Sequence, residues 1–167
     1  MERYCLRGGR LILDGEIVKG DLLLCNGNIE AILPPHTAVS EEYRTVDCTG
    51  KYVSPGFVDI HQHGGGGSDY MDDDPDAYVK ATEAHLLHGV TSVMPTLLSA
   101  DKELMLSAVA RYCAATVDSR IRANLLGLHM EGRYISPAYA GAQKPERIVK
   151  KIQELFPNAG YQIIHEF

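Results

Sequence analysis

The first fifty or so residues alternate short apolar runs with turn signals. The apolar runs lie at residues 11–13, 21–25 and 29–33, and residues 45–48, after a polar stretch, are expected to form one more strand. The dipeptides Asp14-Gly15 and Asn26-Gly27 separate the first three runs, and both favour a tight hairpin turn whose two central residues have φ > 0. The pattern therefore predicts a β-meander that ends at Pro34-Pro35.

Beyond this meander, the hydrophobic period alternates between that of strands and that of helices. Strands are predicted at 57–63, 90–96, 125–131 and 161–165, and helices at 75–88, from Ser99 and from Pro145. Asp74 and Ser99 are suited to cap the first two helices, and Gly89 to end the first. Strands that alternate with helices indicate parallel pairing through helical crossovers, which a doubly wound sheet and a (β/α)8 barrel satisfy equally.

Composition and charge narrow the class of protein. Hydrophobic residues make up 45% of the 167 residues and charged residues 23%, as in soluble globular domains, and the net charge is −6. The sequence has no basic stripe of the kind that binds nucleic acid and no run of about 18 apolar residues that would span a membrane. Four scattered cysteines without CxxC spacing favour reduced thiols. We therefore expect a cytoplasmic protein without nucleic-acid or membrane partners.

Two histidines at the end of the predicted 57–63 strand are the strongest chemical signal. Alternate residues of a strand point the same way, so Asp59, His61 and His63 share one face. Val58 and Ile60 share the other face, which is expected to pack against helices. Two neutral imidazoles on one face can share a zinc, iron or similar divalent ion, although an isolated His-x-His fits two exposed loop histidines equally well.

A carboxylate at the end of the 125–131 strand strengthens the metal hypothesis. His129 and Glu131 share a face, and Gly132 follows them. Alone, Glu131 is more readily a solvated loop residue than a ligand. However, catalytic groups of β/α folds collect at the carboxyl ends of strands, where His61, His63 and Glu131 are all predicted to lie.

Two further features carry a weaker signal. The four glycines at 64–67 directly after the His pair let the backbone approach a ligand closely, although they lack the spacing of a phosphate-binding fingerprint. His85 and His88 fall within the first predicted helix, where packing or surface roles are expected.

Several motifs in a fixed order resemble one enzyme family. The segment at 55–64, PGFVDIHQHG, resembles the metal-binding opening of the amidohydrolase superfamily. The segments at 88–92 (HGVTS), 95–96 (PT), 127–132 (GLHMEG), 135–137 (ISP) and 140–143 (AGAQ) narrow the resemblance to the N-acetylglucosamine-6-phosphate deacetylase family. The similarity runs over essentially the whole chain.

The resemblance implies a fold and a domain organisation. The family has a (β/α)8 TIM-like barrel beside a small β-sandwich built from both chain ends. By that resemblance, residues 1–54 supply N-terminal sandwich strands, and residues 55–167 supply the first three to four β/α units of an incomplete barrel.

The resemblance also implies an activity: metal-dependent deacetylation of N-acetylglucosamine 6-phosphate to glucosamine 6-phosphate and acetate. Glu131, His61 and His63 would hold one or two divalent ions, zinc or iron, and Ala142 and Gln143 would contact the sugar. The family's later ligands and catalytic Asp are expected beyond residue 167, so the chain alone is expected to lack a general base and to be inactive. The full-length protein is expected to form a homodimer.

Two alternatives remain open from the sequence. One is a related cyclic amidase of the dihydroorotase or allantoinase type, whose members share His-x-His but usually lack a carboxylate like Glu131. The other is a non-catalytic, truncated remnant. Two departures from the family pattern bear on the site: Arg133-Tyr134 replaces Pro-Phe, and Gln143 replaces a frequent His.

Overall fold

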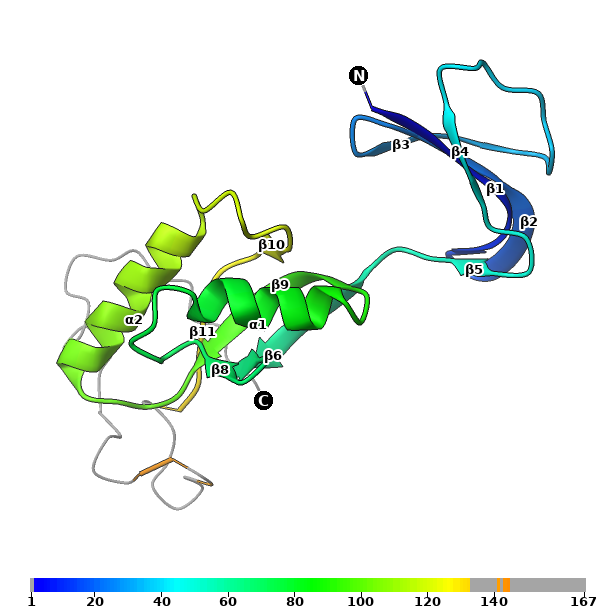
Figure 1. The fold of residues 1–167 in the computed structure, drawn as a ribbon. Helices are drawn as coiled ribbons and strands as arrows, with labels where there is room; N and C mark the ends of the chain where they lie inside the picture. Colours follow the sequence, from blue (N-terminus) through cyan, green and yellow to red (C-terminus); the bar gives the residue numbers. More distant parts are fainter. Residues whose placement is uncertain (1, 133–140, 142, 145–167) are drawn as a thin grey trace. The chain divides into compact units, whose positions relative to one another are not determined.

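The computed structural model describes residues 2–132, 141 and 143–144. The chain divides into two compact units, Met1–Pro55 and Gly56–Phe167 (Figure 1). The helix predicted from Pro145 and the strand predicted at 161–165 lie outside the described residues. No helix of the described part is long and apolar enough to cross a membrane.

The first unit is a five-stranded sheet. Its strands are β1 (Arg3–Leu13), β2 (Glu16–Cys25), β3 (Asn28–Leu33), β4 (Arg44–Asp47) and β5 (Tyr52–Val53). The strands β1, β2 and β3 pair antiparallel in sequence order, while β4 and β5 both pair with β1 in parallel. The predicted meander is therefore confirmed for the first three strands and then continues by parallel pairing.

The two predicted hairpin turns differ in their backbone geometry. Asn26 has φ 49° and Gly27 has φ 78°, as the β2–β3 turn was predicted to require. In the β1–β2 turn Gly15 has φ 77°, whereas Asp14 keeps a negative φ, so the expectation of two positive values is wrong there. A turn with one positive φ needs only one glycine, which relieves the aspartate of an unfavourable conformation.

A buried carboxylate stabilises an irregularity in β1. Asp21 is fully buried, and its Oδ1 accepts a hydrogen bond of 2.7 Å from the Gly8 N–H. The β1–β2 register shifts between Leu6 and Gly9, so the Gly8 N–H turns away from the ladder towards Asp21. The Arg7 Nε lies 3.5 Å from Asp21 Oδ2 and supplies an opposite charge.

The second unit is a mixed α/β layer with a parallel sheet. Its elements are β6 (Phe57–Gln62), β7 (Gly64–Gly65), β8 (Ser68–Asp69), α1 (Ala77–Leu86), β9 (Val90–Leu97), α2 (Lys102–Ala115), β10 (Asn124–Leu125) and β11 (His129–Met130). The strand β9 pairs in parallel with β6, β10 and β11. Since α1 and α2 connect successive parallel strands, the predicted β/α alternation is confirmed over the described residues (Figure 1).

Three predicted boundaries are corrected. The single strand expected at 125–131 is two short strands, β10 and β11. Between them Gly127 has φ 152°, which interrupts the strand. The helix α1 begins at Ala77 rather than at 75, and its N-cap residue is Asp76 rather than Asp74. The N-cap of α2 is Asp101 rather than Ser99, since the Asp101 side chain accepts the Leu104 N–H.

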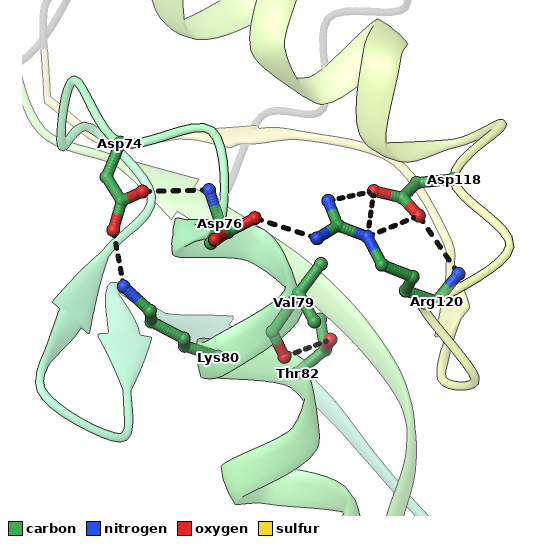
Figure 2. A network of polar contacts seen from close by, with 7 residues as sticks. All are labelled: Asp74, Asp76, Val79, Lys80, Thr82, Asp118 and Arg120. Atoms are coloured by element: carbon green, nitrogen blue, oxygen red, sulfur yellow. Dashed lines mark hydrogen bonds and ion pairs between the residues drawn. The ribbon is translucent and has the colours of Figure 1, made fainter.

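The polar residues around the start of α1 explain where that helix begins. The Asp74 carboxylate accepts the Asp76 N–H at 2.9 Å and pairs with Lys80 at 2.7 Å, so it stabilises the turn before the helix (Figure 2). Asp76 pairs at 2.8 Å with Arg120, which also pairs with Asp118 (Figure 2). Arg120 therefore connects the start of α1 with the segment after α2, and its guanidinium holds the pKa of Asp118 below its usual value.

The core of the second unit lies between the helices and β9. It contains Tyr70, Leu97, Met105 and Ala108, all at most 1% exposed. Met105 and Ala108 lie on the face of α2 that the helical spacing of Leu104, Met105, Ala108, Val109 and Tyr112 predicts to be apolar, and their burial confirms that face at its centre. In β6, Val58 and Ile60 were expected to pack against helices, but they are 61% and 62% exposed. The helix α1 packs on β7, β8 and β9, so neither residue is covered by the described helices.

Candidate metal centre

Three side chains predicted from the sequence converge at the carboxyl ends of parallel strands. His61 is in β6, His63 follows that strand, and Glu131 follows β11. Glu131 Oε2 lies 3.2 Å from His61 Nε2 and 3.0 Å from His63 Nε2. One ligand atom from each residue falls within 4.8 Å of the others. The structure therefore brings together residues that are up to 70 positions apart in the sequence.

The end of β9 aligns the two strands that carry these side chains. His129 pairs with Thr96 in register, and the Glu131 N–H donates to the Leu97 carbonyl at 2.9 Å. On the other side, the Gln62 N–H donates to the Thr96 hydroxyl at 3.1 Å. The β6 strand is thus hydrogen-bonded to Thr96, and the residue after β11 to Leu97. These contacts place His61, His63 and Glu131 at the same end of the sheet.

The arrangement fits a divalent metal ion. Ligands about 2.0–2.2 Å from an ion in tetrahedral geometry lie about 3.4 Å from one another, close to the distances found between Glu131 and each imidazole. A hydrogen-bonded His–carboxylate pair also has such distances. A metal is favoured because one oxygen of Glu131 faces the Nε2 atoms of both His61 and His63. Side-chain exposures of 52%, 36% and 35% for His61, His63 and Glu131 leave the group open to solvent.

Neighbouring residues restrain the rings of the two candidate histidine ligands. The Nδ1 of His63 lies 3.1 Å from the Thr96 carbonyl oxygen, which can only accept, so the proton of His63 is on Nδ1 and Nε2 is available to a metal. The His129 ring packs edge-on against His61, with ring centres 4.8 Å apart. Sequence reasoning placed Thr96 in a motif of the resemblance without a role of its own, and it placed His129 only on a face shared with Glu131.

The glycine run forms a tight hairpin next to His63. The strands β7 and β8 pair through Gly64 and Asp69, and a Cβ at Gly64 would lie 2.0 Å from the Ser68 carbonyl oxygen. His85 Nε2 lies 2.9 Å from the Gly64 carbonyl oxygen and therefore donates to it. His85 was expected only to pack or to face solvent. Its hydrogen bond to Gly64 instead links α1 to the hairpin. An open hollow of about 460 Å³ lies against His63 and this hairpin.

The residues expected to contact a sugar have different outcomes. Ala142 lies outside the described residues. Gln143 is 6% exposed, its Oε1 accepts the Ser99 N–H at 2.9 Å, and its side chain packs against Gly132. The amide nitrogen of Gln143 is buried and lacks a hydrogen-bond partner among the described residues. Contact between Gln143 and a sugar therefore stays a prediction.

Comparison with known proteins decides the family. Residues 52–160 match the amidohydrolase family. The chain belongs to this family, whose members are metal-dependent hydrolases. The resemblance stated from the motifs is thereby confirmed.

Individual relatives are deacetylases of amino-sugar phosphates. The chain is 33% identical over 144 residues to N-acetylgalactosamine-6-phosphate deacetylase of Escherichia coli O157:H7, a match that covers 86% of this chain and 37% of that protein. It is 32% identical over 151 residues to N-acetylglucosamine-6-phosphate deacetylase of Homo sapiens, covering 89% and 35%.

A solved structure extends the similarity to three dimensions. The crystal structure of N-acetylglucosamine-6-phosphate deacetylase from Pasteurella multocida superimposes with a TM-score of 0.78 at 28% identity, covering 88% of this chain and 38% of that one. The chain therefore spans between a third and two fifths of the length of these relatives.

Proposed function

We propose that this chain is the metal-binding part of a deacetylase that hydrolyses the acetamide of N-acetylglucosamine 6-phosphate. The products are glucosamine 6-phosphate and acetate. The observation that carries the proposal is the single carboxylate oxygen of Glu131 that faces the Nε2 atoms of His61 and His63. The deacetylase relatives supply the substrate class, a small-molecule amino-sugar phosphate.

The fold proposal follows from the same relatives. The second unit, with its parallel β6, β9 and β10–β11, is proposed to be the start of a (β/α)8 barrel. The first unit is proposed to contribute strands to a small β-sandwich. The TM-score of 0.78 with the Pasteurella multocida enzyme supports both assignments. Homodimerisation of the full-length protein stays a prediction.

The proposed cofactor is one or two divalent ions, zinc or iron, since imidazole and carboxylate ligands suit both metals. Glu131 is proposed as the principal ligand, with His61 and His63 completing the set. A bound ion of this kind would lower the pKa of its water towards about 7, which would make hydroxide available at neutral pH.

Neighbouring residues of the chain orient the proposed metal ligands. The Thr96 carbonyl keeps the proton of His63 on Nδ1, so the Nε2 lone pair points towards Glu131. The glycine hairpin lets the backbone beside His63 approach a ligand without a side chain in between. The general base that passes a proton to the leaving amine is proposed to lie beyond residue 167.

The test measures metal content and acetate release by the intact protein, that is, by a polypeptide that also contains the proposed general base. We expect the wild type to bind a divalent ion and to release acetate from N-acetylglucosamine 6-phosphate, and Glu131→Gln to lose both. Glu103→Gln makes the same change at an exposed residue in the first turn of α2 and is the matched control. Metal content and turnover unchanged in Glu131→Gln would refute the proposal, and preferential hydrolysis of a cyclic amide would favour the dihydroorotase-type alternative.

A further inference from the structure

Thr96 lies at the junction of the three strands that form the metal centre. It is fully buried near the carboxyl end of β9. Its hydroxyl oxygen lies 3.1 Å from the Gln62 nitrogen and 3.2 Å from His129 Nδ1, and its carbonyl oxygen lies 3.1 Å from His63 Nδ1. The two oxygen atoms of one residue thus contact the backbone between the candidate ligands and two imidazole rings.

The chemistry of these groups fixes the direction of each hydrogen bond. The backbone N–H of Gln62 can only donate, so the Thr96 hydroxyl oxygen accepts it. The proton of that hydroxyl then needs an acceptor, because buried polar groups are almost always hydrogen-bonded. Among the described residues, His129 Nδ1 is the acceptor within reach. The hydroxyl therefore donates to His129, whose own proton is on Nε2.

The two rings consequently carry their protons on opposite nitrogens. His63 is protonated on Nδ1 because the Thr96 carbonyl can only accept, and its Nε2 faces Glu131 at 3.0 Å. His129 is protonated on Nε2, and its ring packs edge-on against His61 at an angle of 69°. Thr96 thus reaches His63 directly and His61 through His129.

We propose that Thr96 is the positioning residue of the metal centre. It fixes the tautomer of His63, fastens the backbone between the two histidine ligands and restrains His61 by holding the ring of His129. This inference rests on the proposed metal site. Losing an outer hydrogen-bond partner of this kind typically weakens metal binding about 10- to 100-fold.

The experiment compares two substitutions at Thr96 in the intact protein. Thr96→Val keeps the shape but removes the hydroxyl, and we expect its dissociation constant for Zn²⁺, measured by chelator competition, to rise about 10- to 100-fold. Thr96→Ser keeps the hydroxyl and is expected to rescue binding. Thr82→Val is the matched control, since Thr82 is 2% exposed and donates its hydroxyl to the Tyr78 carbonyl within α1. Thr82→Val is expected to bind Zn²⁺ as the wild type does.

A second readout reports the tautomers without any metal. Imidazole ¹⁵N spectra of the protein stripped by a chelator are expected to show His129 protonated on Nε2 in the wild type, and a mixture of tautomers in Thr96→Val. His129→Asn offers a further variant that keeps an acceptor for the Thr96 hydroxyl but removes the ring against His61. It is expected to weaken Zn²⁺ binding as well, and wild-type affinity in this variant would overturn the route through His129.

The outcomes separate this inference from the proposed function. Unchanged Zn²⁺ affinity in Thr96→Val, an equal loss in Thr82→Val, or His129 protonated on Nδ1 would overturn the role of Thr96. A wild-type protein that binds Zn²⁺ no better than Glu131→Gln would overturn the proposed function instead. In that case the His129 spectrum still decides whether Thr96 sets the tautomer.

Discussion

Replacing Tyr70 by Phe removes a buried hydrogen bond to Gln62, the residue between the candidate metal ligands His61 and His63. Tyr70 is fully buried, and its hydroxyl accepts a hydrogen bond of 2.8 Å from Gln62 Nε2. The Gln62 side chain is itself buried, and its Oε1 has no partner among the described residues. The substitution therefore leaves the whole amide of Gln62 buried without a hydrogen bond.

The expected loss of stability has two components with different pH dependence. At pH 8 the unsatisfied amide is expected to lower the free energy of unfolding by about 1–3 kcal/mol. Burial also raises the pKa of Tyr70 to about 12, an effect that the Gln62 hydrogen bond partly offsets. Because the folded pKa exceeds the unfolded value of about 10, the wild type is fully stabilised below pH 10 and loses stability as the pH rises towards 12.

The alkaline component can be worked out for one pH. At pH 11 the unfolded Tyr70 is about nine-tenths ionised and the folded one about one-tenth, which corresponds to about 1.4 kcal/mol. The advantage of the wild type over Tyr70→Phe is therefore expected to shrink by about 1.4 kcal/mol between pH 8 and pH 11. Burial raises the pKa of Tyr78 as well, and this burial is common to both proteins, so only the smaller contribution of Tyr70 to the pKa of Tyr78 differs between them.

The assay is urea unfolding of the intact protein at both pH values. Tyr52→Phe makes the same change at a residue that is 58% exposed, and it is expected to stay within about 0.5 kcal/mol of the wild type at pH 8. If Tyr70→Phe is as stable as the wild type at pH 8, the Gln62 hydrogen bond contributes nothing. If the difference between them is the same at pH 11, the elevated pKa is wrong.

Two further changes test the site loop and the exposed strand. Gly132→Ala is expected to cost about 1–3 kcal/mol and to weaken metal binding, because Gly132 has φ 93° and a Cβ there would lie 2.6 Å from Gln143 Cδ. Gly50→Ala, at φ 74° with open space around it, is the control for backbone strain alone, and equal melting temperatures for the two variants would contradict the steric argument. The 167-residue polypeptide by itself is expected to associate through the exposed Val58 and Ile60 in β6, and Ile60→Lys to reduce this association. A monomer at every concentration tested by size-exclusion chromatography would refute that expectation.

Local sequence signals predicted the elements of the fold better than their ends. The turn at Asn26-Gly27 was predicted correctly because both residue types tolerate positive φ, which is a local property of the two residues. The start of α1 was misplaced because Asp74 and Asp76 are equally suited to cap a helix. The choice between them depends on Lys80 and Arg120, which pair with them in the folded protein (Figure 2).

The candidate ligands were accessible to sequence reasoning, and the residues that position them were not. His61, His63 and Glu131 stand out because imidazole and carboxylate side chains at strand ends are a chemical signal in themselves. Thr96 carries no such chemical signal, because a threonine in a buried strand is ordinary for β-structure, and the motif of the resemblance that contains it assigns it no role. Its three partners lie 33 or 34 positions away, so its role becomes visible only when β6, β9 and β11 are seen side by side.

The two ends of β6 differ in a way that bears on metal binding. At its start, the Phe57 N–H donates to the Gly89 carbonyl at 2.8 Å, but Phe57 is 67% exposed. Val58 and Ile60, which follow it, are also exposed. At its carboxyl end, Gln62 is buried and is hydrogen-bonded through both its backbone and its side chain, to Thr96 and Tyr70. The carboxyl end of β6 is thus held by polar contacts that do not involve a metal. An ion that binds there meets ligands already close to their bound positions, which reduces the ordering that binding requires. Tyr70→Phe and Thr96→Val loosen this end by different contacts, so both are expected to weaken metal binding.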